Sequence, residues 1–184
     1  MEGPQAPRGG ATAWFTGLPA AGKTSIAGVV ERRLREEGRT VLWLDGDELR
    51  RGLSRDLGFS AADRAENVRR AGEVACLVAE AGVVAVVSLI SPYAAHRAAV
   101  RSRHEELGVP FTEVWVSTPA EVCESRDPKG LWVRARAGEL SGFTGVDDPY
   151  EAPEAAELVV GPWQTAEEAA AEVLRCLARQ GWHV

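Results

Sequence analysis

The sequence predicts an α/β fold of three layers, with a mostly parallel five-stranded sheet and helices on both of its faces. Short β-prone segments alternate with longer segments of helical periodicity along the chain. One β-prone segment, residues 83–90, is apolar at successive positions, which is typical of a central parallel strand covered on both faces. The length of 184 residues suits one hydrophobic core, so we expect a single domain over residues 11–184.

Residues 11–16 (ATAWFT) begin the alternation as a short β-prone run. The next segment, residues 22–38, places apolar side chains on one face and ends in a glycine, which predicts a helix. Residues 40–44 (TVLWL) form the second expected strand, closed by an Asp-Gly-Asp turn. This order predicts a strand–helix–strand unit whose two strands lie parallel.

Asp63 is the expected N-cap of a helix that runs to Gly82, because apolar residues recur at helical spacing after it. The apolar strand of residues 83–90 follows. A helix over residues 94–107 and a strand over residues 110–116 (PFTEVWV) continue the alternation.

The last third of the chain contains a helix that begins at residues 118–119, a short strand at residues 157–160 and a final helix over residues 165–180. Between the first two lie residues 126–149, which are rich in Gly, Pro, Asp and Arg. Long irregular segments inside compact domains tend to be functional. We therefore interpret residues 126–149 as a lid.

The composition excludes several classes of protein. Hydrophobic residues make up 45% and charged residues 26%, which is ordinary for a globular protein. The 21 basic and 27 acidic residues give a net charge of −6, so we expect no nucleic-acid partner. The apolar runs are far shorter than the ~20 residues that span a bilayer. Residues 1–10 lack an apolar signal core, so we expect a flexible N-terminus, no membrane partner and a cytoplasmic location.

The three cysteines are widely spaced and form no CxxC pair. They predict neither a disulfide framework nor a zinc site, and they suit a reducing compartment.

The segment after the first strand, GLPAAGKT, fits the GxxxxGK[ST] phosphate-loop motif between a strand and a helix. In this motif, backbone N–H groups and a helix N-terminus form a concave anion site. Lys23 is expected to reach the β- and γ-phosphates of a nucleotide, and the Thr24 hydroxyl to hold Mg²⁺. The expected nucleotide-binding residues are Gly17, Leu18, Pro19, Ala20, Ala21, Gly22, Lys23, Thr24 and Ser25.

Asp45 and Asp47 follow the second strand on either side of a glycine. Asp-Gly is common in plain turns, but carboxylates at the carboxyl end of a strand beside a phosphate loop favour a catalytic role. Asp45 is expected to order Mg²⁺ through water, and Asp47 to accept a hydrogen bond from an acceptor hydroxyl. The NKxD motif of GTPases is absent from the sequence.

Residues 126–136 contain four basic residues and one acidic residue, a local charge of +3 in an acidic chain. Most surface arginines belong to solvated ion pairs. A positive island in the expected lid, however, favours closure over clustered phosphates, so we expect an anionic acceptor. Trp132 lies in this segment, where its ring could pack either on a base or on the protein itself.

Five ordered blocks of the sequence resemble the adenylyl-sulfate kinase family, from about residue 13 to residue 160. They are WFTGLPAAGKTS, LDGDELRRGLSRDLGFSAADRAENVRR, LISPY, RDPKGLWVRARAGEL and GFTGVDDPYEAPE. The resemblance implies a P-loop kinase fold and an ATP-dependent phosphotransferase with an alcohol acceptor. The implied reaction moves a phosphoryl group from Mg·ATP to the 3′-hydroxyl of adenosine 5′-phosphosulfate (APS). The products would be ADP and 3′-phosphoadenylyl sulfate (PAPS), an activated form of sulfate.

The resemblance also implies roles for individual residues. Arg126 matches an arginine that lies against the ATP adenine, and Thr165 falls near a further adenine contact. The implied acceptor site is Asp47, Arg50, Phe59, Arg64, Asn67, Ile90, Ser91, Lys129, Gly142 and Phe143, with the two phenylalanines on either side of the acceptor adenine. Ser91 matches the serine described in the family as a phosphoserine intermediate. Direct in-line transfer needs no such intermediate, so a hydrogen bond to substrate is the alternative role. The family also implies a homodimer and a functional link to ATP sulfurylase.

The chain departs from the family pattern at four positions. Pro19 and Ala20 stand where the family loop has Ser and Gly, and an alanine is disfavoured if residue 20 needs a positive φ. Ala94 and His96 replace an Arg and an Asp. Lys23, Asp45, Asp47 and Ser91 are retained, so we expect an active enzyme.

Two other functions stay open from the residues alone. One is a P-loop kinase for another small anionic alcohol. The other is a nucleotide-binding partner of ATP sulfurylase without catalytic activity.

Overall fold

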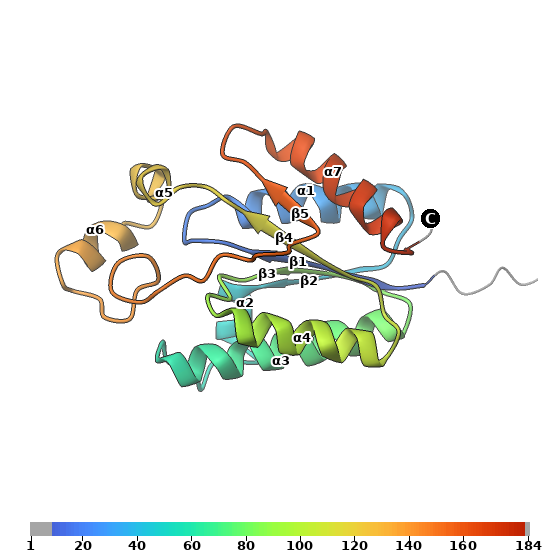
Figure 1. The fold of residues 1–184 in the computed structure, drawn as a ribbon, viewed down its shortest axis with the longest axis horizontal. Coiled ribbons are helices and arrows are strands. Elements are labelled where there is room, and N and C mark those ends of the chain that lie inside the picture. Colours follow the sequence, from blue (N-terminus) through green and yellow to red (C-terminus); the bar gives the residue numbers. More distant parts are fainter. Residues whose placement is uncertain (1–8, 183–184) are drawn as a thin grey trace, which may run out of the picture.

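The computed structural model describes residues 9–182 and contains one sheet with the strand order β2-β3-β1-β4-β5 (Figure 1). All neighbouring strands are parallel, so the predicted mostly parallel sheet is confirmed. The strands are β1 (Ala11–Thr16), β2 (Val41–Asp45), β3 (Val84–Ser88), β4 (Phe111–Val116) and β5 (Leu158–Val160). The middle strand is β1, and the apolar β3 lies between it and β2. The loop after β1 therefore emerges at the centre of the carboxyl edge.

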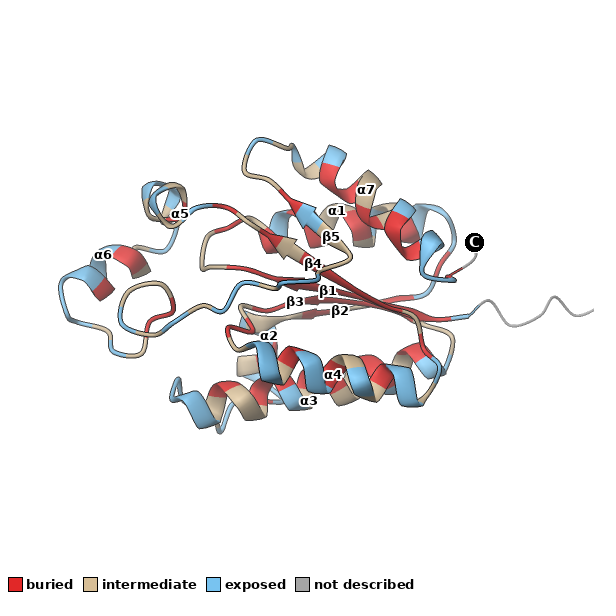
Figure 2. Cartoon of the chain, in the orientation of Figure 1, coloured by how far each residue is buried: buried red, intermediate tan, exposed pale blue. Residues whose placement is uncertain are grey.

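The helices cover both faces of the sheet (Figures 1 and 2). Helices α1 (Lys23–Glu36) and α7 (Ala166–Arg179) pack together on one face, and α3 (Ala61–Glu80) and α4 (Ala94–Glu106) on the other. Each buries one face against the sheet and exposes polar side chains on the other, as the 3.6-residue period requires. The buried faces of α1, α3 and α7 are mostly small or branched apolar residues, whereas α4 buries Arg97 and His104 beside Val100. The expected three-layer arrangement is confirmed.

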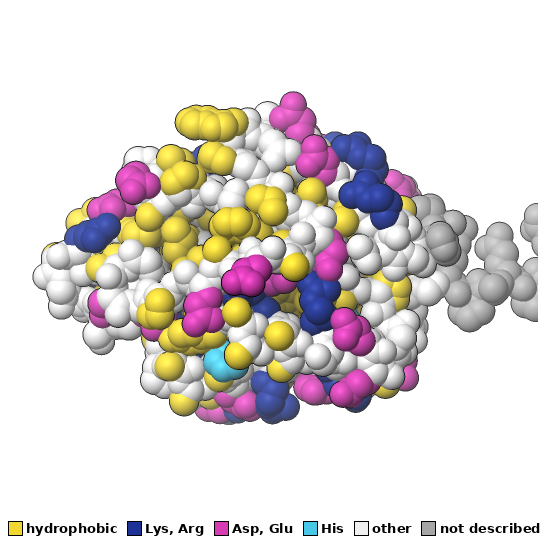
Figure 3. All heavy atoms as spheres, in the orientation of Figure 1, with side chains coloured by type: hydrophobic (Ala, Val, Ile, Leu, Met, Phe, Trp, Pro, Cys, Tyr) yellow, Lys and Arg dark blue, Asp and Glu magenta, His cyan; other side chains and the backbone are white. Residues whose placement is uncertain are grey.

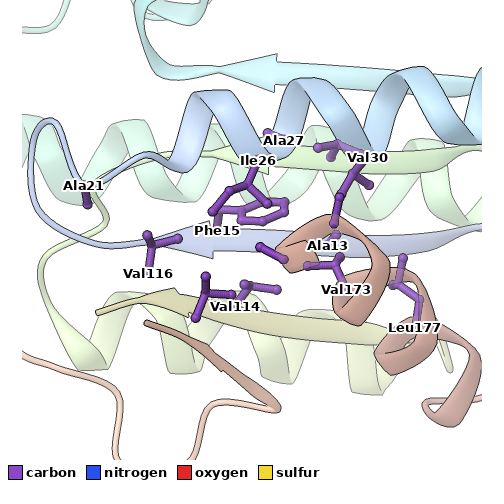
Figure 4. Close-up of a cluster of buried hydrophobic side chains, with 14 of the residues drawn as sticks. Ala13, Phe15, Ala21, Ile26, Ala27, Val30, Val114, Val116, Val173 and Leu177 are labelled. Carbon is purple, nitrogen blue, oxygen red and sulfur yellow. The ribbon is translucent and has the colours of Figure 1, made fainter. Parts of the chain in front are cut away.

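Two clusters of buried side chains hold these layers together. On the α1 and α7 face, Phe15 and Val114 pack against Ile26 and Val173 (Figure 4). A second cluster on the α3 and α4 face is built around Trp14. Because the residues of β1 are buried on both faces, the strand that precedes the phosphate loop is fixed from both sides.

Three short helices lie near the carboxyl edge of the sheet: α2 (Gly46–Arg51), α5 (Ala120–Arg126) and α6 (Leu131–Arg136). The sequence predicts α5, but it gives a turn where α2 begins and an irregular lid where α6 forms. The N-cap of α3 is Ser60 rather than Asp63. Ser60 accepts the Asp63 backbone N–H and donates its own hydroxyl to the Asp63 carboxylate, so the aspartate is the third residue of a capped turn.

The N-terminal ten residues are only partly described, because residues 1–8 lie outside the described range. Gly9 and Gly10 are fixed within the fold: Gly10 is buried, and the Trp182 indole donates to the Gly9 carbonyl at 3.0 Å. Among residues 9–182, no helix is both long and apolar enough to cross a membrane.

Candidate active site

The loop after β1 combines the backbone geometry of an anion site with one strained residue. Gly17 has φ +150°, and a Cβ there would lie 2.6 Å from the Val116 carbonyl oxygen, so only glycine fits. Gly22 has φ +109° and forms the N-cap of α1. Ala20 adopts φ +64°, a left-handed conformation that costs an alanine about 1–2 kcal/mol. The loop therefore keeps the conformation expected at residue 20 and strains the alanine.

Lys23 is buried in this loop and donates to the carbonyl oxygens of Gly17 at 2.8 Å and Leu18 at 2.6 Å. Burial lowers the pKa of its ammonium group to about 8, although Asp45 and Asp47 oppose the shift. The chain has only two lysines, and the other is Lys129 of the expected lid. A buried ammonium without a carboxylate in hydrogen-bond contact is suited to receive an anionic ligand.

Asp45 connects the phosphate loop to the second strand. Its Oδ2 accepts hydrogen bonds from Thr24 Oγ1 at 3.2 Å and Ser88 Oγ at 2.8 Å, and its Oδ1 accepts the Asp47 backbone N–H at 3.0 Å. The Trp43 indole donates to Ser88 Oγ at 3.0 Å, which orients that hydroxyl. A carboxylate and a hydroxyl are oxygen ligands of the type that Mg²⁺ takes together with substrate phosphates. Thr24 and Asp45 therefore fit a magnesium ion.

Sequence reasoning missed Ser88 as part of this group. The available signal was a single hydroxyl in an otherwise apolar strand, and only the structure shows that this residue pairs in register with Asp45.

Asp47 is exposed at the start of α2 and forms an ion pair with Lys129. The expected lid thus reaches the second of the two carboxylates, in the first turn of α2. Trp132 of the lid is fully buried, donates from its indole to the Pro19 carbonyl at 3.2 Å and packs edge-on against Phe143 at 5.3 Å. Of the two roles left open for Trp132, the structure shows packing on the protein.

Other predicted acceptor-site residues gather where the N-terminus of α3 meets the lid. Arg64 donates to the Phe59 carbonyl at 3.1 Å and to the Gly142 carbonyl at 2.5 Å, and so joins the two segments. The Arg50 guanidinium lies 4.2 Å from the centre of the Phe59 ring. Phe59 is exposed, whereas Phe143 is buried against Trp132.

Asn67 faces the same region from α3. It is buried, and its side-chain oxygen has no hydrogen-bond partner among residues 9–182. A buried acceptor of this kind is costly unless a ligand or water completes it.

Ile90 and Ser91 follow β3. The Ile90 carbonyl accepts the Thr16 hydroxyl at 2.7 Å. Ser91 has φ +40°, is buried, and its hydroxyl accepts the Trp14 indole N–H at 3.2 Å. Arg97 of α4 donates to the Ser91 carbonyl at 2.7 Å and pairs with the buried Glu113 of β4 at 2.7 Å. The strained backbone at Ser91 is therefore anchored to α4 and β4.

A hollow of about 160 Å³ lies beside the phosphate loop on the α1 and α7 face. Arg126 stands at its rim and donates to the Ala21 carbonyl at 3.3 Å and the Pro162 carbonyl at 3.5 Å. Thr165 does not line the hollow. It caps α7, with its hydroxyl accepting the Glu168 N–H, while both of its chain neighbours face the hollow.

The structure thus brings the phosphate loop, the hollow of about 160 Å³ beside it, and the Asp45 and Asp47 carboxylates together at the carboxyl edge of the sheet. Residues 126–149 meet this group through the Lys129–Asp47 ion pair and the Trp132 hydrogen bond to the loop. A family model described as adenylylsulphate kinase matches residues 9–161. The chain belongs to the adenylylsulphate kinase family. Its sheet and helices are those of a P-loop kinase, as the structures of family members show.

Three relatives show how closely the chain follows this family. The bifunctional enzyme CysN/CysC of Mycobacterium tuberculosis is 51% identical over 171 residues, which are 93% of this chain and 28% of that protein. The adenylyl-sulfate kinase of Shewanella sp. is 55% identical over 147 residues, covering 80% of this chain and 71% of that enzyme. A solved structure of the M. tuberculosis APS kinase CysC in complex with AMPPNP and APS is 50% identical, with a TM-score of 0.91. It covers 94% of this chain and 99% of the solved one.

Proposed function

We propose that this chain is an adenylyl-sulfate kinase that phosphorylates the 3′-hydroxyl of APS with ATP. The observation that carries the proposal is the position of Asp47. Its carboxylate pairs with Lys129 of residues 126–149, and its backbone N–H donates to Asp45, which also accepts the Thr24 hydroxyl of the phosphate loop. Asp47 is thus linked to both the donor side and the acceptor side. Family membership and the APS-bound relative support the choice of acceptor.

On the donor side, the backbone N–H groups of the loop and the Lys23 ammonium would bind the ATP phosphates. Lys23 now donates to loop carbonyls, so a triphosphate would give it stronger, charge-assisted partners. Thr24 and Asp45 would hold Mg²⁺, Asp45 through water. When bound, that ion would neutralise charge on the phosphoryl group during transfer.

On the acceptor side, Asp47 would accept a hydrogen bond from the 3′-hydroxyl and orient it for in-line attack. Lys129 and Arg50 would meet the phosphosulfate, and the exposed Phe59 ring would stack on the acceptor adenine. Asn67 would donate and accept at the edge of the same nucleotide. Lys129 must then break its ion pair with Asp47 and bind the phosphosulfate instead. The Asp47 carboxylate is then free to accept a hydrogen bond from the 3′-hydroxyl.

Ser91 would act through hydrogen bonding rather than as a phosphorylated intermediate. Its hydroxyl is buried and already engaged by the Trp14 indole. Direct transfer places the attacking and leaving oxygens in line and needs no covalent step at this residue.

The decisive experiment incubates the purified chain with Mg·ATP and APS and detects PAPS by mass spectrometry. Lys23→Ala is expected to abolish PAPS formation, and Leu77→Ala, an exposed change on α3, to leave it intact. Shikimate, gluconate and nucleosides serve as competing acceptors. Release of ADP with one of these but not with APS would replace the proposed acceptor. ATP binding with no acceptor-dependent ADP release would identify a non-catalytic partner.

We also propose that the chain works as a cytoplasmic homodimer alongside an ATP sulfurylase. The family resemblance supports the homodimer and the link to ATP sulfurylase. The bifunctional relative carries the matched region within a much longer protein, which supports a link to a second enzyme.

A further inference from the structure

Trp163 is the most exposed of the large apolar side chains in the described chain, at 88% exposure. Three other tryptophans, Trp14, Trp132 and Trp182, are at most 2% exposed. A single exposed apolar residue needs no special explanation. The location of Trp163, however, connects it to the candidate active site.

Trp163 lies in a tight turn between β5 and α7. The Gln164 backbone N–H donates to the Gly161 carbonyl at 3.5 Å, and the Gly161 N–H donates to the Gln164 side-chain oxygen at 2.8 Å. The Gln164 side chain is itself held by Glu172 at 3.1 Å. The backbone on both sides of the exposed indole is therefore fixed.

The same turn forms one wall of the 160 Å³ hollow beside the phosphate loop. Gly161, Pro162 and Gln164 line that hollow, and Trp163 is the one member of the turn that does not. Apolar side chains gather on the face of the molecule that carries the β5–α7 connection (Figure 3). Because its chain neighbours Pro162 and Gln164 both line the hollow, a change in the side-chain torsions of Trp163 is the movement that would place the indole over it.

The hollow offers a planar ligand one stacking partner and an apolar floor. Arg126 is exposed at the rim, where its guanidinium donates to two backbone carbonyls. The floor of the hollow is lined by Ile26, Val116 and Val160. Ala21, Gly22 and Ser25 also line it, so the hollow adjoins the site for nucleotide phosphates. A second planar group is what the hollow lacks.

We propose that Trp163 closes over the base of the nucleotide bound at the phosphate loop, so that the base lies between the indole and the Arg126 guanidinium. The inference rests on the proposed function and adds a residue that sets nucleotide affinity. Every base has a π-face, so stacking on the indole strengthens binding without selecting the base. Trp163 therefore governs affinity for ATP and GTP alike.

The test compares Trp163→Ala, Trp163→Phe and the control Leu77→Ala in the full chain. Trp163→Ala is expected to raise the KM for ATP about tenfold, with kcat and the KM for APS unchanged. The KM for GTP, where measurable, should rise by the same factor. Trp163→Phe keeps an aromatic face and should restore most of the affinity, and Leu77→Ala should match the wild type.

Fluorescence titration with ATP alone separates this inference from the proposed reaction. Nucleotide binding should quench tryptophan emission in the wild type, and Trp163→Phe should lose most of that change. A wild-type chain that shows this quenching but forms no PAPS would overturn the proposed function and leave the inference standing. An active wild type whose KM for ATP is unchanged in Trp163→Ala would overturn the inference alone.

Discussion

Nucleotide binding should draw a proton into the protein at alkaline pH, because Lys23 is buried with a pKa of about 8. A bound triphosphate raises that pKa, since an opposite charge favours the ammonium form. At pH 8.5 a group of pKa about 8 is roughly one-quarter protonated, so full protonation in the complex takes up about three-quarters of a proton. At pH 7.0 the group is already about nine-tenths protonated, and the uptake falls to about 0.1 proton.

Isothermal titration calorimetry in buffers of different ionisation enthalpy measures this uptake directly. Phosphate oxygens titrate near pH 6, so ATP itself contributes little at pH 8.5. Lys23→Arg is the matched control, because a guanidinium stays charged throughout this range. Tight ATP binding with an uptake below about 0.2 proton at pH 8.5 would show that Lys23 is not the residue that meets the triphosphate.

The same lysine makes a prediction for stability without nucleotide. Its pKa in the folded chain, about 8, is below the ordinary value of 10.5, so the unfolded chain binds more protons between these values. The free energy of unfolding should therefore rise as the pH increases from about 8 to about 10.5. The gain attributable to Lys23 is at most about 3 kcal/mol, and urea titrations of the wild type and Lys23→Arg would resolve it.

Three further predictions concern the loop, the lid and the Asp47 carboxylate. Ala20→Gly removes the cost of φ +64° and should raise the free energy of unfolding by about 0.5–1 kcal/mol. The control Ala21→Gly should lower the free energy of unfolding. Equal effects of the two substitutions in thermal melts would contradict backbone strain at Ala20. Trp132→Ala empties a fully buried site and should cost about 3–5 kcal/mol in urea unfolding, and a loss under 1 kcal/mol would mean that the lid is not anchored. Asp47→Asn should lower kcat about 100-fold in the PAPS assay, because the amide cannot take up the proton of the acceptor hydroxyl; a near-normal kcat would remove Asp47 from catalysis.

The sequence predicts the strands and long helices because their signals are local. Hydrophobic period and glycine stops locate β1, α1 and β3 within one or two residues of their observed ends. The order of strands in a sheet depends on long-range contacts. An apolar run shows that a strand is covered on both faces, but not which position it takes in the sheet. The middle position belongs to β1, between β3 and β4, and the more apolar β3 lies beside it.

Of the two missed helices, α2 depends on a local N-cap and α6 on tertiary contacts. Asp45-Gly46-Asp47 has the composition of a turn, yet the Asp45 side chain accepts the Asp47 N–H and starts a helix. Helix α6 is only six residues long and sits in a Gly-rich segment, where propensity alone favours a loop. It forms around Trp132, whose burial is visible only once the lid meets the phosphate loop.

The motifs indicated the phosphate loop and both carboxylates, and the structure brings Thr24, Asp45 and Ser88 into one hydrogen-bonded group. Motifs could not show that Ser91 turns its hydroxyl toward an indole, or that Lys129 spans to Asp47. These contacts join segments far apart in the chain, so no local pattern encodes them.

The anchoring of Trp132 limits which part of residues 126–149 can swing. Exposing a buried indole of roughly 200 Å² would cost about 5 kcal/mol, so a wholesale opening in each turnover would be rarely populated. The Lys129–Asp47 contact is solvent-exposed and costs far less to break. Substrate entry is therefore expected to move only the part of the segment around Lys129. Trp132 would stay buried and keep its neighbours packed on the phosphate loop.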